Sequence, residues 1–468
     1  MAHLFELAEP AFVPVLDPEF RPAALANRAF IQLVAESGSP QPLVVALERG
    51  RGAISRYETV CLPDTHPQSS LNLEYAERLV KFLLWGRGGW RVIIGGSKMV
   101  GEHIRSVYSN NGVRKFDFDF MGGVYGKEFV VEIMEPEDVP QASESTMSLG
   151  GHLDGCRIGF DLGASDRKVS AVIDGEAVFT EEVVWDPRNA TDPRYHFDEL
   201  MAAFDSAAKH LPRIDAIGGS AAGVYIDNRP RVASLYRGIP KELFDTKTVN
   251  LFFDLQKAMG GVPFDVVNDG EVTALAGAMS LEDSPILGLA FGSSQAAGYV
   301  NPKGEITTWL NELAFAPVDY NPHAASCEWS GDIGVGALYF SQQAIFKLAP
   351  AAGIDIDPSL GLAEKLVVVQ KHLEDGHAGA MKIWDAIGIY LGYSLAHYSN
   401  FYEIKHVLIL GRVTSGVGGD IILAKAKEVL AKEFPELNNI SITLPDEKAR
   451  RVGQAVAAAS LPCILKNK

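Results

Sequence analysis

Two segments of the chain join apolar, strand-like runs through a tight turn of small residues. They are GFDLGASDRKVSAV (159 to 172) and AFGSSQAAGYV (290 to 300). Short apolar runs bounded by Gly and Ser are typical of buried strands, so each segment is predicted to form a β-hairpin. Helical patterns alternate with further strand-like runs between and after these hairpins. The alternation indicates an α/β protein whose two lobes contain one hairpin each.

A stretch rich in Pro, Ser, Gly and acidic residues separates this region from the N-terminal part of the chain. It covers residues 136 to 155 and lacks periodic apolar positions, as expected of a linker. We therefore predict an N-terminal α/β domain over 1–150, a first lobe over 155–283 and a second lobe over 284–468. Within the N-terminal domain we expect a helix at 73–86, a strand at 90–96 and a second strand pair within 116–133.

Composition limits the possible partners. The chain has 468 residues, of which 47% are hydrophobic and 22% charged, so a large core is available. The net charge of −17 opposes a nucleic-acid or anionic-membrane partner, because both require a concentrated basic surface. No apolar run approaches the roughly 20 residues that span a bilayer, and the acidic N-terminal residues do not resemble a signal peptide. The four widely separated cysteines match neither a disulfide framework nor paired zinc knuckles, so we expect a cytoplasmic protein with reduced thiols.

The first hairpin contains residue types that suit phosphate binding. Its turn of Gly163, Ala164 and Ser165 can present backbone N–H groups to phosphate oxygens. Asp161, at the end of the preceding strand, is a carboxylate that can hold Mg²⁺ through water. An ordinary β-hairpin would also account for these residues.

The second hairpin has an equivalent turn. Gly292, Ser293 and Ser294 form it, and two hairpins, one in each lobe, can close on a triphosphate from opposite sides. Further along, residues 408 to 426 end a strand in a loop that contains Gly411 and Thr414 and then begin a helix. The loop can receive the adenosine portion of a nucleotide because glycine allows close backbone approach, or it can merely reverse the chain.

Between the hairpins, a strand-like run ends in Asn268-Asp269 and passes directly into a helical pattern. This arrangement predicts a carboxylate at the rim of a cleft between the lobes. There Asp269 can accept a hydroxyl proton while the oxygen attacks a phosphoryl group. Asp is also a common helix N-cap, and the residues taken alone favour that second interpretation.

The order of these motifs over residues from about 155 to 460 resembles the ROK family of sugar kinases and related regulators. Residues 158 to 172 resemble its first phosphate hairpin, 218 to 232 its Gly-containing segment before the sugar site, and 267 to 278 its Asn-Asp catalytic motif. The resemblance implies a two-lobed actin-like ATPase core of the ribonuclease H-like type, extended here by the N-terminal α/β domain. It also implies ATP and Mg²⁺ as cofactors.

The resemblance assigns roles to individual residues. Asp269 would be the catalytic base and Asn268 would contact sugar hydroxyls. WLNELAFAP (309 to 317) resembles a sugar-contact motif, which makes Glu312 the sugar-binding acid and puts Phe315 where the family has a His. The remaining assignments are Gly223 for the substrate, Asp161 for Mg²⁺ through water, and Asp161, Gly163, Ser165, Gly292, Ser293, Ser294, Gly411 and Thr414 for the nucleotide.

Several positions depart from the family pattern. The family's zinc signature would fall at 326 to 340, where only Cys327 remains, and one thiol cannot hold a tetrahedral zinc. We therefore expect no zinc site, with Trp329 and its apolar neighbours filling the space. Gln295 in the second hairpin can narrow the phosphate path. Arg412 stands where a second Gly is usual, where it can fill or border the nucleotide pocket or hold phosphate.

These features predict an ATP-dependent kinase that acts on a hydroxyl of a hexose or hexosamine-like sugar. The alternative is a non-catalytic sugar- or nucleotide-sensing protein of the same fold, whose N-terminal domain meets a partner. The altered second hairpin and adenosine loop support this alternative. Regulators of the family carry a DNA-binding winged helix, and residues 1 to 150 show no such pattern with a basic recognition helix. The identity of the sugar, the role of residues 1 to 150 and the oligomeric state stay open, with a homodimer among the options.

Overall fold

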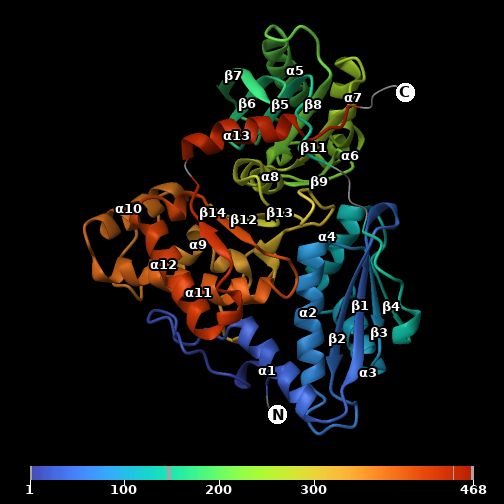
Figure 1. The fold of residues 1–468 in the computed structure, drawn as a ribbon, viewed down its shortest axis with the longest axis vertical. Helices are drawn as coiled ribbons and strands as arrows, with labels where there is room; N and C mark the ends of the chain where they lie inside the picture. Colours follow the sequence, from blue (N-terminus) through green and yellow to red (C-terminus); the bar gives the residue numbers. More distant parts are fainter. Residues whose placement is uncertain (1–2, 145–148, 446, 465–468) are drawn as a thin grey trace. The chain divides into compact units, whose positions relative to one another are not determined.

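The structure is a computed structural model that describes residues 3–144, 149–445 and 447–464. The described residues form four sheets with helices packed against them, which confirms the predicted α/β class (Figure 1). Contacts divide the chain into two compact units. Unit 1 contains residues 1–145, 289–297 and 309–444, and unit 2 contains residues 146–288, 298–308 and 445–468.

Unit 2 is built on a mixed five-stranded sheet in the order β11-β8-β5-β6-β7. The hairpin pairs β5 (Cys156–Leu162) antiparallel with β6 (Asp166–Ile173), and β7 (Glu176–Val184) continues antiparallel. On the other side, β8 (Ala216–Ala221) and β11 (Phe264–Asn268) are parallel to β5. The first predicted hairpin is therefore confirmed, and the carboxyl ends of three parallel strands lie at one edge of the sheet.

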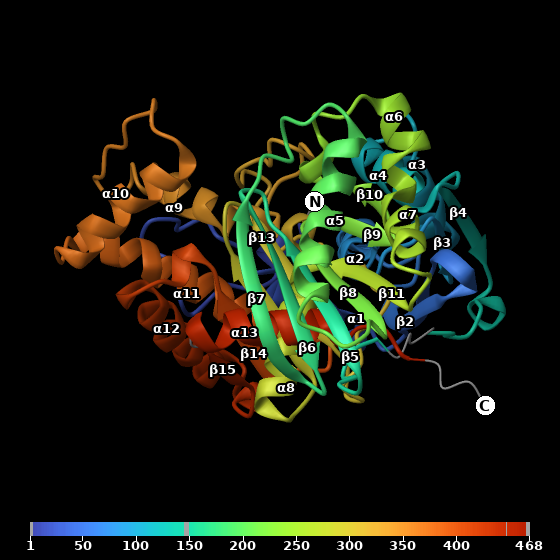
Figure 2. The same cartoon turned by 90° about the horizontal axis from the view of Figure 1, so that it is seen from above.

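Helices cover the two faces of this sheet. On one face, α5 (Pro193–Ala208) and α7 (Leu251–Ala258) contribute to a core that includes Phe160, Phe204 and Phe252. On the other face, α13 (Glu447–Ala459) packs against β5, β6 and α8 (Asp269–Leu281) (Figures 1 and 2). Successive residues of a strand point to opposite faces, so Phe160 faces the aromatic core while its neighbour Gly159 faces α13.

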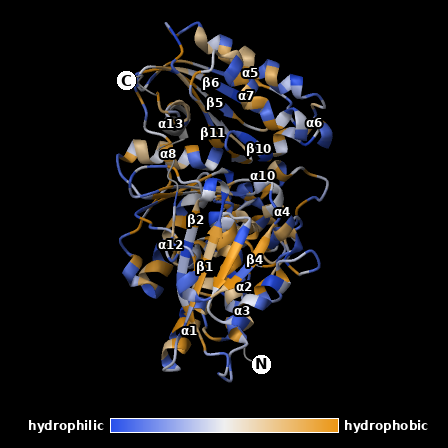
Figure 3. Ribbon diagram, turned by 90° about the vertical axis from the view of Figure 1, so that its right-hand side faces the viewer, coloured by the Kyte–Doolittle hydropathy of each residue, from blue (hydrophilic) through white to orange (hydrophobic). Residues whose placement is uncertain are grey.

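The N-terminal part of unit 1 is a sheet in the order β2-β1-β3-β4. Its strands are β1 (Gln41–Glu48), β2 (Ile54–Cys61), β3 (Arg91–Gly95) and β4 (Val130–Met134), and Figure 3 shows hydrophobic residues along β1. The helices are α1 (Ala23–Glu36), α2 (Leu71–Arg87), α3 (Lys98–Val107) and α4 (Lys115–Tyr125). The predicted helix and strand at 73–96 are confirmed as α2 and β3.

The predicted strand pair within 116–133 is wrong in its first half, because residues 115–125 form α4. The alternating sequence FDFDF has the period of a strand, but Phe116 and Phe120 also have the four-residue spacing of one helical face. Both rings pack on Trp85 of α2, with centroids 6.1 and 4.7 Å away. Packing against α2 therefore decides between two periodicities that the sequence allows.

The rest of unit 1 belongs to the second lobe. The four-stranded sheet of this lobe has the order β13-β12-β14-β15, where β12 is Ile286–Phe291, β13 Gln295–Val300, β14 His406–Leu410 and β15 Ser441–Thr443. Of β12 and β13, residues 289–297 belong to unit 1. Four helices accompany the sheet, namely α9 (Gln342–Leu348), α10 (Leu362–Glu374), α11 (Ala378–Tyr398) and α12 (Val417–Glu433). The second predicted hairpin is thus formed by β12 and β13. Of the described residues, no helix combines the length and the apolar character needed to cross a membrane.

The compact units do not follow the predicted domain limits. Residues 1–145 share a unit with most of the second lobe, and residues 445–468 return to the first-lobe unit. The N-terminal segment accounts for part of the first difference, since Phe20 packs on Tyr390 of α11 at 4.7 Å and the backbone N–H of Ala11 donates to Glu433 at 2.7 Å. Part of the predicted linker, residues 145–148, lies outside the described residues.

The C-terminal helix α13 packs against the five-stranded sheet of unit 2, and this packing depends on glycines in the strands. A Cβ atom on Gly218 would lie 1.8 Å from the carbonyl oxygen of Ala458, so only glycine allows α13 to approach β8 this closely. We expect Gly218→Ala to destabilise the protein by about 1–3 kcal/mol or more, as overpacking does. Gly453→Ala in α13 is the matched control, because its new methyl would meet its nearest neighbour, Ala276 Cβ, at 3.8 Å. It should stabilise by about 0.5–1 kcal/mol through helix propensity. Thermal unfolding of both variants tests this, and equal midpoints would contradict the packing described.

Candidate functional site

The carboxyl ends of β5, β8 and β11 bring three polar residues to one edge of the first-lobe sheet. In the register of the strands, Asp161 lies opposite Ser220, and Asn268 lies opposite Ala221. The Ser220 hydroxyl donates to Asp161 Oδ1 at 2.7 Å. Parallel pairing therefore brings together residues that are more than a hundred positions apart, and Asp269 follows directly on the last of these strands.

Lys168 is a residue of this site that the sequence reasoning missed. It pairs with Asp161 across the hairpin, and its ammonium lies 3.5 Å from Asp161 Oδ2 and 3.0 Å from Asp166 Oδ1. Burial lowers the pKa of Lys168, but Asp161 and Asp166 outweigh burial and the net shift is upward. The three-residue turn sets the register of the hairpin, so this cross-strand pair is a signal that the sequence contained.

The turn of the first hairpin is held by its own hydrogen bonds. The N–H of Gly163 donates to the Asp166 carbonyl at 3.0 Å, so this N–H is used inside the hairpin. The Trp185 indole donates to the Gly163 carbonyl at 2.9 Å, and the Trp185 N–H donates to the Ser165 carbonyl at 3.2 Å. The Ser165 hydroxyl donates to Asp166 Oδ2 at 3.1 Å, so the N–H groups of Ala164 and Ser165 are the phosphate donors that this turn can offer.

Asn268, and not Asp269, is the N-cap of α8. The Asn268 side-chain oxygen accepts from the Gly270 N–H at 2.7 Å, and its amide group donates to the Gly223 carbonyl at 2.8 Å. Gly223 has φ +124°, a conformation that favours glycine. Asp269 is the first residue of the helix, and its Oδ1 accepts a longer bond from the same Gly270 N–H at 3.1 Å. Asn268 therefore caps the helix. Helix capping does not explain why a carboxylate stands at position 269.

The surroundings of Asp269 make it a stronger base than an ordinary Asp. Burial, and after it the negative charge of Asp161, raise the pKa of Asp269 to about 6. Desolvation and a nearby like charge both disfavour the ionised form. A buried carboxyl group with a pKa near the working pH is typical of a general base, although ion networks without a catalytic role can produce the same shift.

The second lobe has its own group of predicted residues. In the turn of Gly292, Ser293 and Ser294, the Gly292 N–H donates to the Ser294 carbonyl at 3.0 Å, and the Gly292 carbonyl accepts from Gln342 at 2.9 Å. Gly411 follows β14 with φ +102°, and a Cβ there would lie 2.4 Å from the carbonyl oxygen of Phe291. The loop that follows β14 and the second hairpin are therefore neighbours within this lobe.

The loop after Gly411 borders a cavity of about 220 Å³. Arg412 and Ser415 line it on one side, and Glu364, Val367 and Gln370 of α10 line it on the other. The Gln370 amide holds the loop by donating to the Arg412 carbonyl at 2.8 Å. Thr414 is buried, with its hydroxyl on the Gly411 carbonyl at 2.8 Å. In this loop Arg412 borders a pocket and does not fill it.

The sequence predicts that the Gln295 side chain narrows a phosphate path, but the structure places this side chain elsewhere. Its side chain is buried, and a Cβ on Gly336 would lie 2.2 Å from Gln295 Oε1. The amide group thus points into the second lobe beside the 3₁₀ helix Gly336–Leu338. Gly336 leaves the space that this side chain needs.

Glu312 lies on a segment that contacts the N-terminal domain. Its N–H donates to the carbonyl of Trp85 at 2.9 Å, and Phe315 packs on the Trp85 ring with centroids 4.4 Å apart. The expectation that Trp329 fills the space of a zinc site is wrong, because 73% of its surface is exposed. Cys327 is buried. Of the described residues, no three His, Cys, Asp or Glu side chains are grouped as metal ligands.

The predicted residues thus form two sets. Asp161, Gly163, Ser165, Gly223, Asn268 and Asp269 lie in unit 2, whereas Gly292, Ser293, Ser294, Glu312, Gly411 and Thr414 lie in unit 1. The positions of the residues in each set are determined by the elements of their own unit.

No model of a known protein family matches the sequence, and a search of curated proteins finds no similar chain. Solved structures are similar in fold. One is a ROK family transcriptional regulator, a homologue of the E. coli MLC protein, with 17% identity and a TM-score of 0.51 over 66% of this chain and 79% of that chain. Another is the ROK hexokinase from Thermus thermophilus, with 16% identity and a TM-score of 0.50 over 65% of this chain and 97% of that chain. The chain therefore has the fold of ROK proteins, which confirms the predicted resemblance and its two-lobed core.

The cap assignment can be tested without knowing the function. Asn268→Ala removes both the cap of α8 and the hydrogen bond to Gly223, so we expect a loss of about 1–2 kcal/mol of unfolding free energy. Asp269→Asn should change stability by less than about 0.5 kcal/mol, because Asn268 keeps the cap. Denaturant unfolding of the two variants measures the difference. A larger loss in Asp269→Asn than in Asn268→Ala would show that Asp269 is the cap.

Proposed function

We propose that the protein transfers the γ-phosphoryl group of ATP to a hydroxyl of a hexose or hexosamine-like sugar. The observation that carries the proposal is the Asn268-Asp269 pair, in which Asn268 caps α8 and Asp269 has a pKa raised to about 6. The fold supports it, since the solved structures with this fold include a hexokinase. Fold alone would not, because a transcriptional regulator has it too.

In the proposed reaction, Asp269 accepts the proton of the sugar hydroxyl while the oxygen attacks the γ-phosphorus. At pH 7 to 8 a carboxyl group with a pKa of about 6 is mostly ionised, and it is more basic than an ordinary Asp. Asn268 is fixed by two hydrogen bonds and would orient the sugar through its remaining hydrogen-bonding capacity. Glu312 would accept from a second sugar hydroxyl.

The phosphates would lie on the turns of the two hairpins, with Gly163 and Ser165 on one and Gly292, Ser293 and Ser294 on the other. Gly411 and Thr414 would receive the adenosine portion, beside the cavity that Arg412 borders. Glycine and small hydroxyl residues suit this role because they let backbone N–H groups approach the phosphates.

Asp161 fits Mg²⁺ held through water. Magnesium is usually bound by one or two carboxylates together with phosphates and waters, and Asp161 supplies a half-buried carboxylate fixed by the Ser220 hydroxyl. When bound, Mg²⁺ neutralises charge on the β- and γ-phosphates. Lys168, next to Asp161, adds a positive charge from the protein itself.

Lys168 also supports the alternative of a non-catalytic sugar- or nucleotide-sensing protein. Its ammonium already pairs with the carboxylate that would hold the metal. Coupled ATP turnover across a panel of hexoses and hexosamines separates the two functions. A kinase shows turnover with one class of sugar. A sensor shows a ligand-induced rise in melting temperature without turnover.

Asp269→Asn tests the role of the base. The variant keeps the size of the side chain but cannot take the hydroxyl proton, so we expect turnover to fall at least about a hundredfold. Sugar affinity should change by less than about tenfold, because Asn268 and Glu312 remain. Turnover, sugar affinity and melting temperature are measured on the same preparation. Turnover close to that of the wild type would refute the assignment of Asp269.

The pKa of Asp269 also predicts a pH dependence. The base works only when ionised, so kcat/KM for the sugar should fall about tenfold per pH unit below pH 6. An ordinary Asp would hold the rate constant down to about pH 4. The measurement uses saturating nucleotide, and the residual rate of Asp269→Asn provides the baseline because it contains the same titration of the nucleotide. A ratio of the two rates that stays constant down to pH 5 would contradict the raised pKa.

A further inference from the structure

Helix α2 of the N-terminal domain ends on the segment that carries Glu312. The backbone N–H groups of Leu310, Asn311 and Glu312 donate to the carbonyls of Arg87, Gly86 and Trp85, at 3.2, 3.0 and 2.9 Å. The last carbonyls of an α-helix have no partner inside the helix, so they depend on donors of this kind. Residues 310–312 therefore act as the C-terminal cap of α2, and α2 in turn fixes their backbone.

Aromatic packing strengthens the same attachment. Phe315, three residues after Glu312, packs on Trp85 of α2 with ring centroids 4.4 Å apart, and its ring centroid lies 5.8 Å from that of Phe116 of α4. Arg87 at the end of α2 lies 3.1 Å above the ring of Trp309. Aromatic and cation–π contacts of this type stabilise a packed segment beyond the area that they bury. The segment around Glu312 is thus held on both sides by side chains of α2 and α4.

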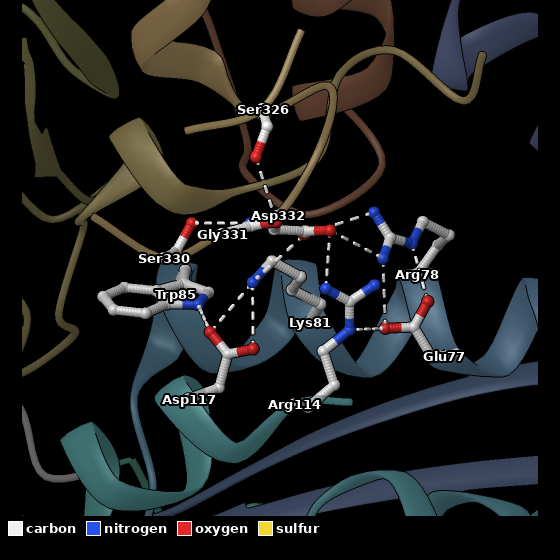
Figure 4. Close-up of polar contacts among 10 residues, drawn as sticks. All are labelled: Glu77, Arg78, Lys81, Trp85, Arg114, Asp117, Ser326, Ser330, Gly331 and Asp332. Carbon is white, nitrogen blue, oxygen red and sulfur yellow. Dashed lines mark hydrogen bonds and ion pairs between the residues drawn. The ribbon is translucent and has the colours of Figure 1, made fainter. Parts of the chain in front are cut away.

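A second attachment lies further along the chain, at Asp332 (Figure 4). Three cationic side chains from the N-terminal domain contact its carboxylate. Arg114 Nη1 lies 2.5 Å from Oδ1, Lys81 Nζ 3.2 Å from Oδ2, and Arg78 Nη1 3.3 Å from Oδ2. Arg78 and Lys81 lie three residues apart on one face of α2, and Arg114 immediately precedes α4.

The charges of this cluster are balanced, and those of Lys81 and Asp332 are buried. Lys81 is 0% exposed and Asp332 5% exposed. Lys81 also contacts both oxygens of Asp117, at 2.8 and 2.9 Å, and Arg114 and Arg78 both bind Glu77. The three cations thus face the three carboxylates of Glu77, Asp117 and Asp332. Burial alone would raise the pKa of Asp332, but Arg78 and Lys81 hold it below the ordinary value, so the carboxylate stays charged.

The loop 317–335, which carries Asp332, is closed on itself. Residues 317 and 335 pair at its base, and Ser326 pairs with Ile333 near its tip. The Cys327 N–H donates to the Asp332 carbonyl at 2.8 Å, and Gly331 donates back to Cys327 at 2.9 Å. Paired backbone therefore connects Asp332 to residues 316–317, which directly follow the 3₁₀ helix Leu313–Phe315 next to Glu312.

We propose that Asp332 is a positioning residue, which sets Glu312 for sugar binding by clamping the loop 317–335 to Arg78, Lys81 and Arg114. The proposal rests on the proposed function for the sugar, whereas the clamp itself rests on the contacts. Its consequence is that the N-terminal domain controls sugar affinity without touching the sugar. Nucleotide binding, for which the proposed residues lie on other segments, is not controlled by the clamp.

Asp332→Asn tests the clamp, because it removes the charge that three buried cations share and keeps the shape of the side chain. Hydrogen exchange of peptides that cover residues 309–316 should become at least about tenfold faster, while peptides from β14 should not change. The KM for the sugar should rise at least about tenfold, with the KM for ATP changed less than about threefold. Combining Asp332→Asn with Glu312→Gln should give less than the product of the two single effects on the sugar KM, because the same contact is lost in both.

Two control variants separate positioning from loss of stability. Val429→Ala removes buried methyl groups from α12, which packs on α11 and contributes no residue to the clamp, so it should lower the melting temperature and change the sugar KM less than about threefold. Glu328→Gln removes an exposed charge from the same loop and should change neither. If Asp332→Asn does not fold, Arg114→Gln removes a single partner of Asp332 and should give smaller changes in the same direction.

The outcomes distinguish the two proposals. Unchanged exchange at 309–316 in a folded Asp332→Asn protein, or in Arg114→Gln, would overturn the clamp whatever the function is. Faster exchange together with equal rises in the KM values for sugar and ATP would overturn the positioning role. A wild-type protein that neither binds nor phosphorylates any sugar of the panel would refute the proposed function and the role of Asp332 in it, while the exchange data still decide whether the clamp exists.

Discussion

The buried ammonium of Lys81 joins the N-terminal part of unit 1 to the second lobe. It is fully removed from solvent and lies between Asp117 of the N-terminal domain and Asp332 of the second lobe. Removing one partner of a buried ion pair costs about 3–5 kcal/mol, because the remaining charge loses its compensation. The N-terminal residues and the second lobe fall into one compact unit, and they are joined there by a buried charge that has partners in both.

A second constraint, the parallel register of β5, β8 and β11, creates the candidate site in unit 2. The three strands end at the same edge, so Asp161 and Asp269 come close enough for one charge to raise the pKa of the other carboxyl group. Helix α13 packs closely against Gly159 of β5 and Gly218 of β8, and so covers one face of these strands. The catalytic proposal thus follows from a sheet whose geometry is fixed by backbone pairing and by two glycines.

Much of the fold and of the candidate site could be predicted from the sequence, because the residues that form each motif are close together in the chain. The strand-turn-strand segments and the Asn268-Asp269 junction have short-range patterns, and the structure contains both hairpins. Other features depend on tertiary contacts. FDFDF fits a strand and a helix equally until Trp85 is placed beside it, and Trp329 is apolar but lies at an exposed loop tip. The charges of α2 are typical of a solvated helix face, and only Asp332, some 250 positions away in sequence, makes them a buried cluster.

The loop that contains Asp332 shows how one fold can stabilise a segment by different means. The resemblance to ROK proteins would place a thiolate-bound zinc here, where this chain keeps only the buried Cys327. A metal site closes a loop onto itself, whereas the ion pairs of Asp332 join the loop to another domain. An ion-pair cluster also needs every partner in place, because each buried charge is costly alone. It follows that residues 78, 81 and 114 contribute to the packing of the second lobe, and that residues 1–145 are not independent of the rest of unit 1.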